Sequence, residues 1–553
     1  MYCANCIRPI VQDGNLEPQQ SNADDAKRYG SPQTDPTVGV IYKTAGTRQF
    51  VVALSKDNVR RGDYVEVDHP QLGPVMGQLT EVEEVSSLSY DQAQSIRLGA
   101  KMSISKKLSG NVDVIGYRDR DGLVQTPTTP FAPGAKVRLA DDAAIAKVLG
   151  LAKDETTGAY IGLLQGHELK VCLDINTLVQ KHISVIAKTG SGKSYLVGVM
   201  LEEFIKKSIP SVVIDPHGEY LSLVYPNTEA EESAKMKRFG VTPRSYSKNV
   251  VEYTTSKEDN PLALEIKLDG LGLSPDDIFD LTAIKAAGIQ AGMVYRAIDG
   301  LKRINPYYSL DDIIFTLERD KNPLKWNVIN ALEHIKTLNI FAERPTKMSE
   351  VVKPGQVSIL SLKGVTEDVL AVFVTQFVKR LFLERKAGKV PPMMLFVEEA
   401  HTFCPQMGQT LSNKVFRTIA SEGRKFGMGL CVVTQRPAKV DKNVLSQCNT
   451  QIIFKVTNPN DLKAIGASLE GMTATMQDDI QRLPVSYAMM VGGWITKPIT
   501  VEVRVRETKH GGKGADLFSA QQDIEEEADD EQYYAAEDDT YEEHNRQEDH
   551  EIP

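Results

Sequence analysis

The chain has 553 residues and 41% hydrophobic content, which is sufficient for large buried cores. No run approaches the roughly 18 uninterrupted apolar residues of a membrane span, and the first residues lack the apolar segment of a signal peptide. Six scattered cysteines are typical of a reducing compartment and not of a disulfide framework. We therefore exclude integral membrane proteins and disulfide-rich secreted proteins, and we expect a cytoplasmic protein of roughly two to four domains with no membrane partner.

The net charge of −10 is unevenly distributed along the chain. Residues 521–553 contain 15 Asp and Glu residues against one Arg, so this segment carries −14 and the rest of the chain +4. An acidic segment of this kind repels itself and cannot bury a core. We expect a solvated, disordered tail. A tail that competes with nucleic acid or recruits a basic partner is the alternative.

The N-terminal part of the chain changes character near residue 36. Residues 1–35 are polar and predict a flexible segment, and its pair Cys3 and Cys6 has no second Cys or His pair nearby, so we expect no zinc site there. Short apolar runs separated by turn residues then predict a small β-barrel or sandwich over 36–165. These runs lie at 38–42, 49–54, 63–69, 75–82, 111–119 and 135–140.

The stretch ISVIAKTGSGKSYLV at 183–197 indicates a P-loop. A buried strand, a Gly-rich turn and the start of a helix are the context that this motif needs. Backbone N–H groups around Gly190 and Gly192 wrap a phosphate, Lys193 reaches the β- and γ-phosphates, and Ser194 holds Mg²⁺. The sequence therefore predicts ATP and Mg²⁺ as cofactors. The predicted nucleotide-binding residues are Lys188, Thr189, Gly190, Ser191, Gly192, Lys193, Ser194 and Tyr195.

Alternating strands and helices follow the P-loop and are typical of a parallel sheet. The predicted strands lie at 211–215, 356–362, 393–400, 429–435 and 450–456, and two more apolar runs lie at 486–493 and 498–507. Ser274 and Ser309 have the pattern of helix N-caps in a helical stretch between these strands. We predict an α/β fold: a RecA-like P-loop ATPase core with an N-terminal small β-barrel and a helical insertion. The core comprises 166–255 and 351–507, the helical subdomain 256–350, and the C-terminal extension with the acidic tail 508–553.

Acidic and polar residues end three of the predicted strands. Glu398 and Glu399 end the strand MMLFVEE, where Glu398 is predicted to help hold hydrated Mg²⁺ and Glu399 to activate the attacking water. Because parallel sheets bind ligands at the carboxyl ends of their strands, Asp215, Glu219 and Gln435 are expected at the same edge. Asp215 and Glu219 are candidates for positioning metal or water, and Gln435 for sensing the γ-phosphate. A surface acidic pair and turn-forming side chains are the alternatives.

Arg424 and Lys425 precede the strand at 429–435. An arginine supplied from outside the pocket stabilises transition-state charge and contributes roughly 10³- to 10⁵-fold in rate. The two residues are therefore candidates for an arginine finger. A solvated helix end is the alternative, and the sequence alone leaves both open.

Five motifs in order closely resemble the HerA proteins of archaea, which belong to the HerA/FtsK group of hexameric DNA-translocating ATPases. The motifs are AKTGSGKSYLV, IDPHGEY, FVEEAHTF, SEGRKFGMGLCVVTQRP and RVRETKHGG. Together with the N-terminal barrel, the resemblance covers roughly residues 36–512. Two features depart from the family pattern: Ala187 replaces the first P-loop glycine, and a long acidic tail follows the motifs.

The resemblance implies a role for each residue that matches a family motif. Lys193 and Ser194 would bind ATP and Mg²⁺, and Glu399 would be catalytic. Asp215 would be needed for hydrolysis, and Gln435 would sense the nucleotide. Arg424 would act as an arginine finger on the neighbouring subunit.

The resemblance also implies partners and a location. The expected assembly is a homo-hexameric ring around double-stranded DNA that works with the NurA nuclease in resecting broken ends. A Mre11–Rad50-type complex is the expected upstream partner, and the expected location is the cytoplasm, in association with the nucleoid. A related ring ATPase that powers secretion or conjugation, or one that serves a defence effector, shares the same core motifs and is the alternative.

Overall fold

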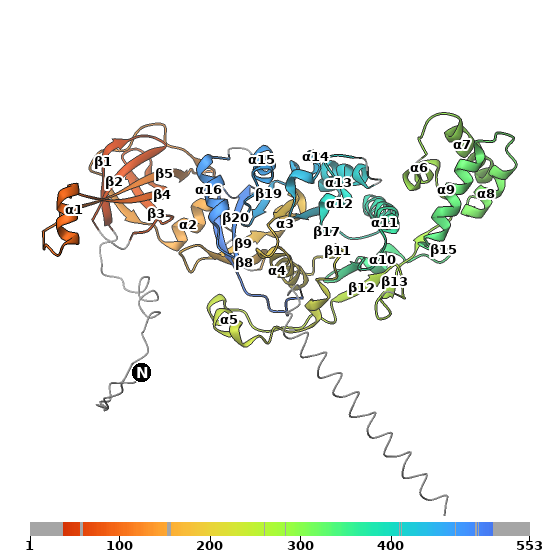
Figure 1. Cartoon of the computed structure of the whole chain (residues 1–553), viewed down its shortest axis with the longest axis horizontal. Coiled ribbons are helices and arrows are strands. Elements are labelled where there is room, and N and C mark those ends of the chain that lie inside the picture. The colour runs from red at the N-terminus through yellow and green to blue at the C-terminus, as the bar shows by residue number, and fades with distance from the viewer. Residues whose placement is uncertain are drawn as a thin grey trace, which may run out of the picture. The chain divides into compact units, whose positions relative to one another are not determined.

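The computed structural model describes residues 37–511, apart from 56–58, 152–155, 259, 283, 409, 411, 470–471, 493–494 and 496. The chain divides into two compact units, Met1–Asp141 and Asp142–Pro553 (Figure 1). The predicted flexible N-terminus, the pair Cys3 and Cys6, and the acidic tail lie outside the described residues. Among the described helices, none has the length and apolar content that crossing a bilayer requires.

The first unit is a β-barrel that closes on itself. The strand order is β2-β1-β7-β3-β4-β5-β6, and an additional pairing of β2 with β5 joins the two sides. Alternating residues such as Val52, Val65, Val112 and Val137 are fully buried, which fills the interior as a small barrel requires. The elements are β1 (Thr37–Ala45), β2 (Gln49–Leu54), β3 (Tyr64–His69), β4 (Gly73–Ser86), α1 (Tyr90–Arg97), β5 (Lys106–Arg118), β6 (Val124–Gln125) and β7 (Lys136–Leu139).

A twelve-stranded sheet forms the centre of the second unit. Its order is β13-β12-β16-β11-β17-β18-β10-β19-β20-β21-β8-β9. The first eight strands in this order are parallel, and the last four are antiparallel to their neighbours. The strands are β8 (Gly158–Leu164), β9 (Lys170–Asp174), β10 (Ile183–Ile186), β11 (Ser211–Asp215), β12 (Val250–Thr254), β13 (Leu264–Glu265), β16 (Val357–Ser361), β17 (Met393–Val397), β18 (Met428–Thr434), β19 (Thr450–Ile453), β20 (Tyr487–Gly492) and β21 (Ile499–Val503).

The fold class predicted from the sequence is confirmed: a P-loop α/β core, an N-terminal β-barrel and a helical insertion. Strand β8 lies inside the range 36–165 that was assigned to the barrel domain, but it pairs with β21 in the large sheet.

Helices and short 3₁₀ turns connect the strands of the second unit. Apart from the insertion described next, the helices are α2 (Asp142–Leu149), α3 (Ile175–Lys181), α4 (Lys193–Lys206), α5 (Ser233–Phe239), α10 (Met348–Val351), α11 (Glu367–Lys386), α12 (Ala400–Phe403), α13 (Asn413–Phe426), α14 (Lys442–Leu445), α15 (Pro459–Ser468) and α16 (Ala474–Arg482). The 3₁₀ turns are η1 (Leu221–Val224), η2 (Ala230–Glu232) and η3 (Pro437–Lys439).

The helical insertion contains α6 (Pro275–Leu281), α7 (Ile289–Ile304), α8 (Leu310–Glu318) and α9 (Lys325–Thr337), which cluster together (Figure 1). Ser274 caps α6 and Ser309 caps α8, each in a capping box, so both predicted N-caps are confirmed. The stretch is not purely helical, because the short strands β14 (Leu268–Asp269) and β15 (Phe341–Ala342) pair with each other at its base.

The P-loop helix α4 is held by a buried ionic cluster that comes from the last part of the described chain. Arg504 is fully buried, and its guanidinium lies 2.9 Å from Glu202 Oε2 and 2.9 Å from Glu203 Oε1 on α4. Its Nε donates to the Tyr160 carbonyl at 2.9 Å. Charges withdrawn from water this completely are tolerated only when they are paired and hydrogen-bonded.

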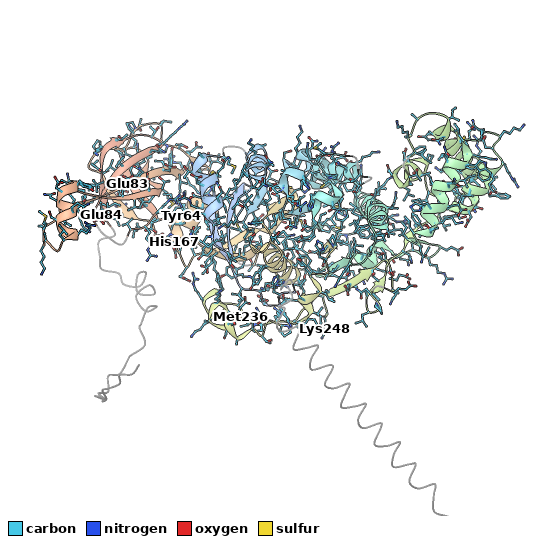
Figure 2. The ribbon with its side chains drawn as sticks, viewed as in Figure 1. Tyr64, Glu83, Glu84, His167, Met236 and Lys248 are labelled. Atoms are coloured by element: carbon cyan, nitrogen blue, oxygen red, sulfur yellow. The ribbon has the colours of Figure 1, made fainter. Side chains whose placement is uncertain are left out.

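The segment 504–511, here called the C-terminal arm, makes further contacts along α4. Arg506 is also buried, and a Cβ added to Gly198 would lie 2.5 Å from its Cζ, so the arm approaches the helix closely. Thr508 donates through both its N–H and its hydroxyl to Glu202 Oε1. Val505 packs against Met236 of α5, which is labelled in Figure 2. The arm therefore holds α4 in place through contacts with residues about 300 positions earlier in the chain.

We predict that Arg504→Met lowers the free energy of unfolding by about 3 to 5 kcal/mol, because Glu202 and Glu203 would both lose the fully buried cation that pairs with them. The control is Arg238→Met, since Arg238 pairs with Glu502 while 44% of its side chain is exposed; there we expect at most about 1 kcal/mol. Urea denaturation of both variants measures the difference. Equal losses of unfolding free energy in the two variants would contradict a larger contribution from the buried cluster.

Candidate nucleotide site

The P-loop lies where the sequence predicts it, between β10 and α4. Gly190 and Gly192 have φ of 76° and 110°, a left-handed region that favours glycine. A Cβ at Gly192 would also approach the Phe454 ring at 3.3 Å. Ala187, in place of the first glycine, is buried and donates its N–H to the Thr434 carbonyl at 3.3 Å. The loop therefore keeps its conformation through the two glycines that follow.

Lys193 brings the P-loop and the end of β17 together. Its Nζ lies 2.6 Å from Glu398 Oε2 and 3.0 Å from Glu399 Oε1. Burial by itself would lower the pKa of Lys193, but the two carboxylates outweigh it and raise that pKa. The ammonium is therefore firmly protonated and carries the positive charge that an anionic oxygen needs as a partner.

Glu399 is the centre of a polar network at the carboxyl edge of the sheet. Its Oε1 accepts from Gln435 Nε2 at 3.1 Å, and Gln435 Oε1 in turn accepts from the Thr189 hydroxyl. Its Oε2 lies 3.2 Å from His401 Nδ1. Glu399 also has a φ of 46°, which is unusual for a residue other than glycine and often marks a functional position.

Asp215 and Glu398 lie behind this network and are almost fully buried. Asp215 accepts from the backbone N–H groups of His217, Gly218 and Tyr220 at 3.2, 2.9 and 3.1 Å, so it shapes the turn after β11. Burial raises the pKa of Asp215 to about 6, against the effect of the Tyr220 N–H and with a further contribution from Glu398. The Tyr220 hydroxyl donates to Glu398 Oε1.

The residues present fit a magnesium ion bound together with a nucleotide. The Ser194 hydroxyl and the Glu398 carboxylate supply the oxygen atoms that Mg²⁺ prefers, and Glu219 Oε2 is buried with no hydrogen-bond partner among the described atoms. Across the part of the chain that the structure describes, no cluster of three or more His, Cys, Asp or Glu side chains could hold a metal. A P-loop site does not require one, because phosphates and waters complete the coordination.

Three other predicted residues make their described contacts outside the Glu399 network, although Lys188 belongs to the P-loop itself. The Tyr195 hydroxyl accepts from the Arg506 N–H at 2.9 Å and donates to Glu232, so this side chain faces the C-terminal arm. Lys188 is exposed, and its N–H donates to the Lys455 carbonyl. Arg424 is exposed in the last turn of α13. Burial lowers the pKa of His182, and the nearby positive charge of Arg424 lowers it further.

The position of Arg424 places it at the opposite edge of the sheet from Glu399. Arg424 lies just before the first residue of β18, Met428, whereas Gln435 directly follows the last, Thr434. Seven strand residues span about 23 Å. Arg424 therefore does not reach the nucleotide site of its own chain.

Two residues in this network were missed from the sequence, Tyr220 and His401. Both lie inside motifs that were recognised, IDPHGEY and FVEEAHTF. Their positions one residue after Glu219 and two after Glu399 are the signal that could have identified them. Their contacts with Glu398 and Glu399 depend on the neighbouring strands, which the sequence does not place.

The fold and the site define a P-loop ATPase with a RecA-like core, and the comparisons with known proteins specify its family. The model of the HerA helicase central domain matches residues 159–381, and that of the HerA-like C-terminal region matches residues 355–491. The chain belongs to the HerA helicase family, whose members are ATP hydrolases that couple hydrolysis to translocation along DNA or its unwinding.

Two relatives extend the match over most of the chain. The DNA double-strand break repair helicase HerA of Saccharolobus solfataricus is 26% identical over 515 residues, covering 88% of this chain and 96% of its own. The protein of the same description in Sulfurisphaera tokodaii is 26% identical over 531 residues, with 88% and 98% covered. The structure of VirB4 of Thermoanaerobacter pseudethanolicus aligns with 63% of this chain and 97% of its own, at 14% identity and a TM-score of 0.46.

We predict that the free energy of unfolding depends on pH through the carboxyl group of Asp215. Because its folded-state pKa is raised to about 6, the folded protein holds the proton more tightly than the unfolded chain, and ionisation destabilises the fold as the pH rises through this range. Relative to Asp215→Asn, the wild type should lose about 2 to 3 kcal/mol of stability between pH 4 and pH 7. Urea denaturation of both proteins at several pH values measures it, and a constant difference would contradict the prediction.

Proposed function

We propose that the protein is an ATP-driven translocase that forms a homo-hexameric ring around double-stranded DNA. Working with a NurA-type nuclease downstream of a Mre11–Rad50-type complex, it drives the resection of DNA ends in double-strand break repair, in association with the nucleoid. The family and the names of its relatives support the reaction on DNA. The observation that carries the ring is the position of Arg424, which is exposed at the sheet edge opposite to Lys193 and Glu399 of its own chain.

In this proposal each residue of the site has a separate task. Lys193 exchanges its carboxylate partners for the β- and γ-phosphates when nucleotide binds, and this exchange releases Glu399. Ser194 and Glu398 would hold a magnesium ion, which would neutralise charge at the phosphates. Glu399 then accepts a proton from the attacking water, and Gln435 connects the γ-phosphate position to the end of β18. Asp215 maintains the turn that carries Tyr220.

The experiment that tests the proposal measures ATPase rate alone, with linear duplex DNA, and with DNA plus the nuclease, on protein whose mass is determined in solution. We expect a particle of six chains whose rate rises with duplex DNA and rises further with the nuclease. Lys193→Ala is the control: it should assemble and remain inactive. A ring whose rate is indifferent to DNA would instead favour a motor for secretion, conjugation or a defence effector.

We predict that Arg424→Ala abolishes hydrolysis and that mixing restores it. Arg424→Ala keeps its P-loop, and Lys193→Ala keeps its arginine. In rings co-assembled from equal amounts of the two, about a quarter of the sites combine an intact lysine with an arginine from the neighbour, and activity should return toward that fraction. Arg424→Ala rings with wild-type activity, or mixed rings with no recovery, would eliminate the arginine finger.

We also predict that His401 orients Glu399. A carboxylate only accepts hydrogen bonds, so in this role His401 donates from a protonated Nδ1, and burial lowers the pKa of His401 and keeps it neutral. Nδ1 of His401 and Oε2 of Glu399 are 3.2 Å apart but are not aligned for a hydrogen bond. Such contacts commonly tighten when substrate binds.

Two substitutions separate these roles. His401→Asn keeps a donor near the position of Nδ1, whereas His401→Gln moves the donor towards the position of Nε2. We expect kcat to fall roughly 10- to 100-fold in His401→Gln and less in His401→Asn, with little change in KM. Equal effects would assign His401 to packing alone.

A further inference from the structure

Five exposed cations gather around the segment that follows β18. They come from the N-terminal turns of α13, from η3 and from the start of α14. The group consists of Lys414, Arg417, Arg436, Lys439 and Lys442, and is called the basic edge below.

The basic edge has few compensating anions. Arg417 pairs with Asp441, which is buried, and Asp461 accepts from the Ala438 N–H at 3.2 Å. The other four cations form no ion pair with any described residue. Among the described residues, Arg417 is thus the one member of the basic edge in an ion pair, and the other four charges are exposed to solvent.

Hydrogen bonds join the elements of the basic edge to the loop that follows α12. The Asp441 N–H donates to the Cys404 carbonyl at 2.8 Å, and the Gln406 N–H donates to the Lys439 carbonyl at 2.7 Å. The Lys442 N–H donates to Gln406 Oε1 at 2.7 Å. The segments after β17 and after β18 thus form one connected layer.

This layer is continuous with the hydrolysis site along both segments. Arg436 directly follows Gln435, and α12 begins one residue after Glu399 and ends one residue before Cys404. A force on Lys439 or Lys442 therefore reaches Gln435 through three or six intervening residues, and reaches Glu399 through the hydrogen bond from Asp441 to Cys404.

We propose that the basic edge binds the phosphate backbone of duplex DNA and couples this contact to ATP hydrolysis. This inference rests on the proposed function. Unpaired lysines on short, anchored segments supply sequence-independent attraction to phosphates, as a motor that moves along any sequence requires. The attachment of the same segments to Gln435 and Glu399 gives DNA a direct mechanical route to the catalytic network.

The test compares two double variants of the full-length protein. Lys439→Ala with Lys442→Ala removes two charges from the basic edge. Lys235→Ala with Lys237→Ala removes two exposed charges from α5 and is the matched control. Assays measure basal ATPase, duplex-stimulated ATPase, and duplex affinity over a series of salt concentrations.

We expect the basic-edge variant to keep its basal rate and to lose stimulation by duplex DNA at least five-fold. The slope of log affinity against log salt should decrease by about one for each phosphate contact removed, whereas the control should match the wild type. Lys439→Arg with Lys442→Arg keeps the charge and should retain stimulation.

The possible failures are distinguishable. If duplex DNA does not stimulate the wild-type protein, the proposed function fails and this inference fails with it. If the wild type and the basic-edge variant are stimulated equally, the proposed function stands and the basic edge is not a DNA contact. Equal loss in the control variant would likewise overturn the inference, because total charge would then account for it.

Discussion

The contact of Lys193 with the two glutamates after β17 is the constraint on which the rest of the site depends. It exists because the strand order places β18 between β10 and β17, so that the P-loop, the acidic pair and Gln435 meet at one edge. A single ammonium compensates two buried carboxylates, which would be costly to keep ionised without a cation. The proposed function assigns the same cation to the phosphates, so the carboxylates and the nucleotide compete for it.

The parts of the fold that depend on local pattern could be predicted from the sequence. The spacing of apolar residues and the turn residues predict the P-loop strand and helix and the acidic end of β17. Capping chemistry predicts the helix starts at Ser274 and Ser309. The parallel-strand pattern placed Glu399 and Gln435 at a common edge, and the structure joins them by a hydrogen bond of 3.1 Å.

The interactions that could not be predicted join residues far apart in the chain. Arg504 and Glu202 are separated by 302 residues, and Tyr220 and Glu398 by 178. Nothing in either local sequence indicates its partner, because the pairing depends on which strands become neighbours. The pattern also could not reveal that β8, in a range assigned to the barrel, belongs to the large sheet, since an apolar run has the same appearance in either setting.

The closure of the N-terminal barrel limits how another chain can bind to it. Each of its six longer strands, β1 to β5 and β7, has a neighbour on both sides. Pairing does not run the full length of every strand, however: the register of β4 with β3 ends at Gln78, whereas its register with β5 continues to Ser86. Strand addition by a partner is therefore confined to the second half of β4, where the backbone edge on the β3 side extends beyond that register. Recognition at the closed part of the barrel relies on side chains and loops, which can change between relatives while the backbone of the barrel stays the same. The barrel can thus acquire a new partner without a change of fold.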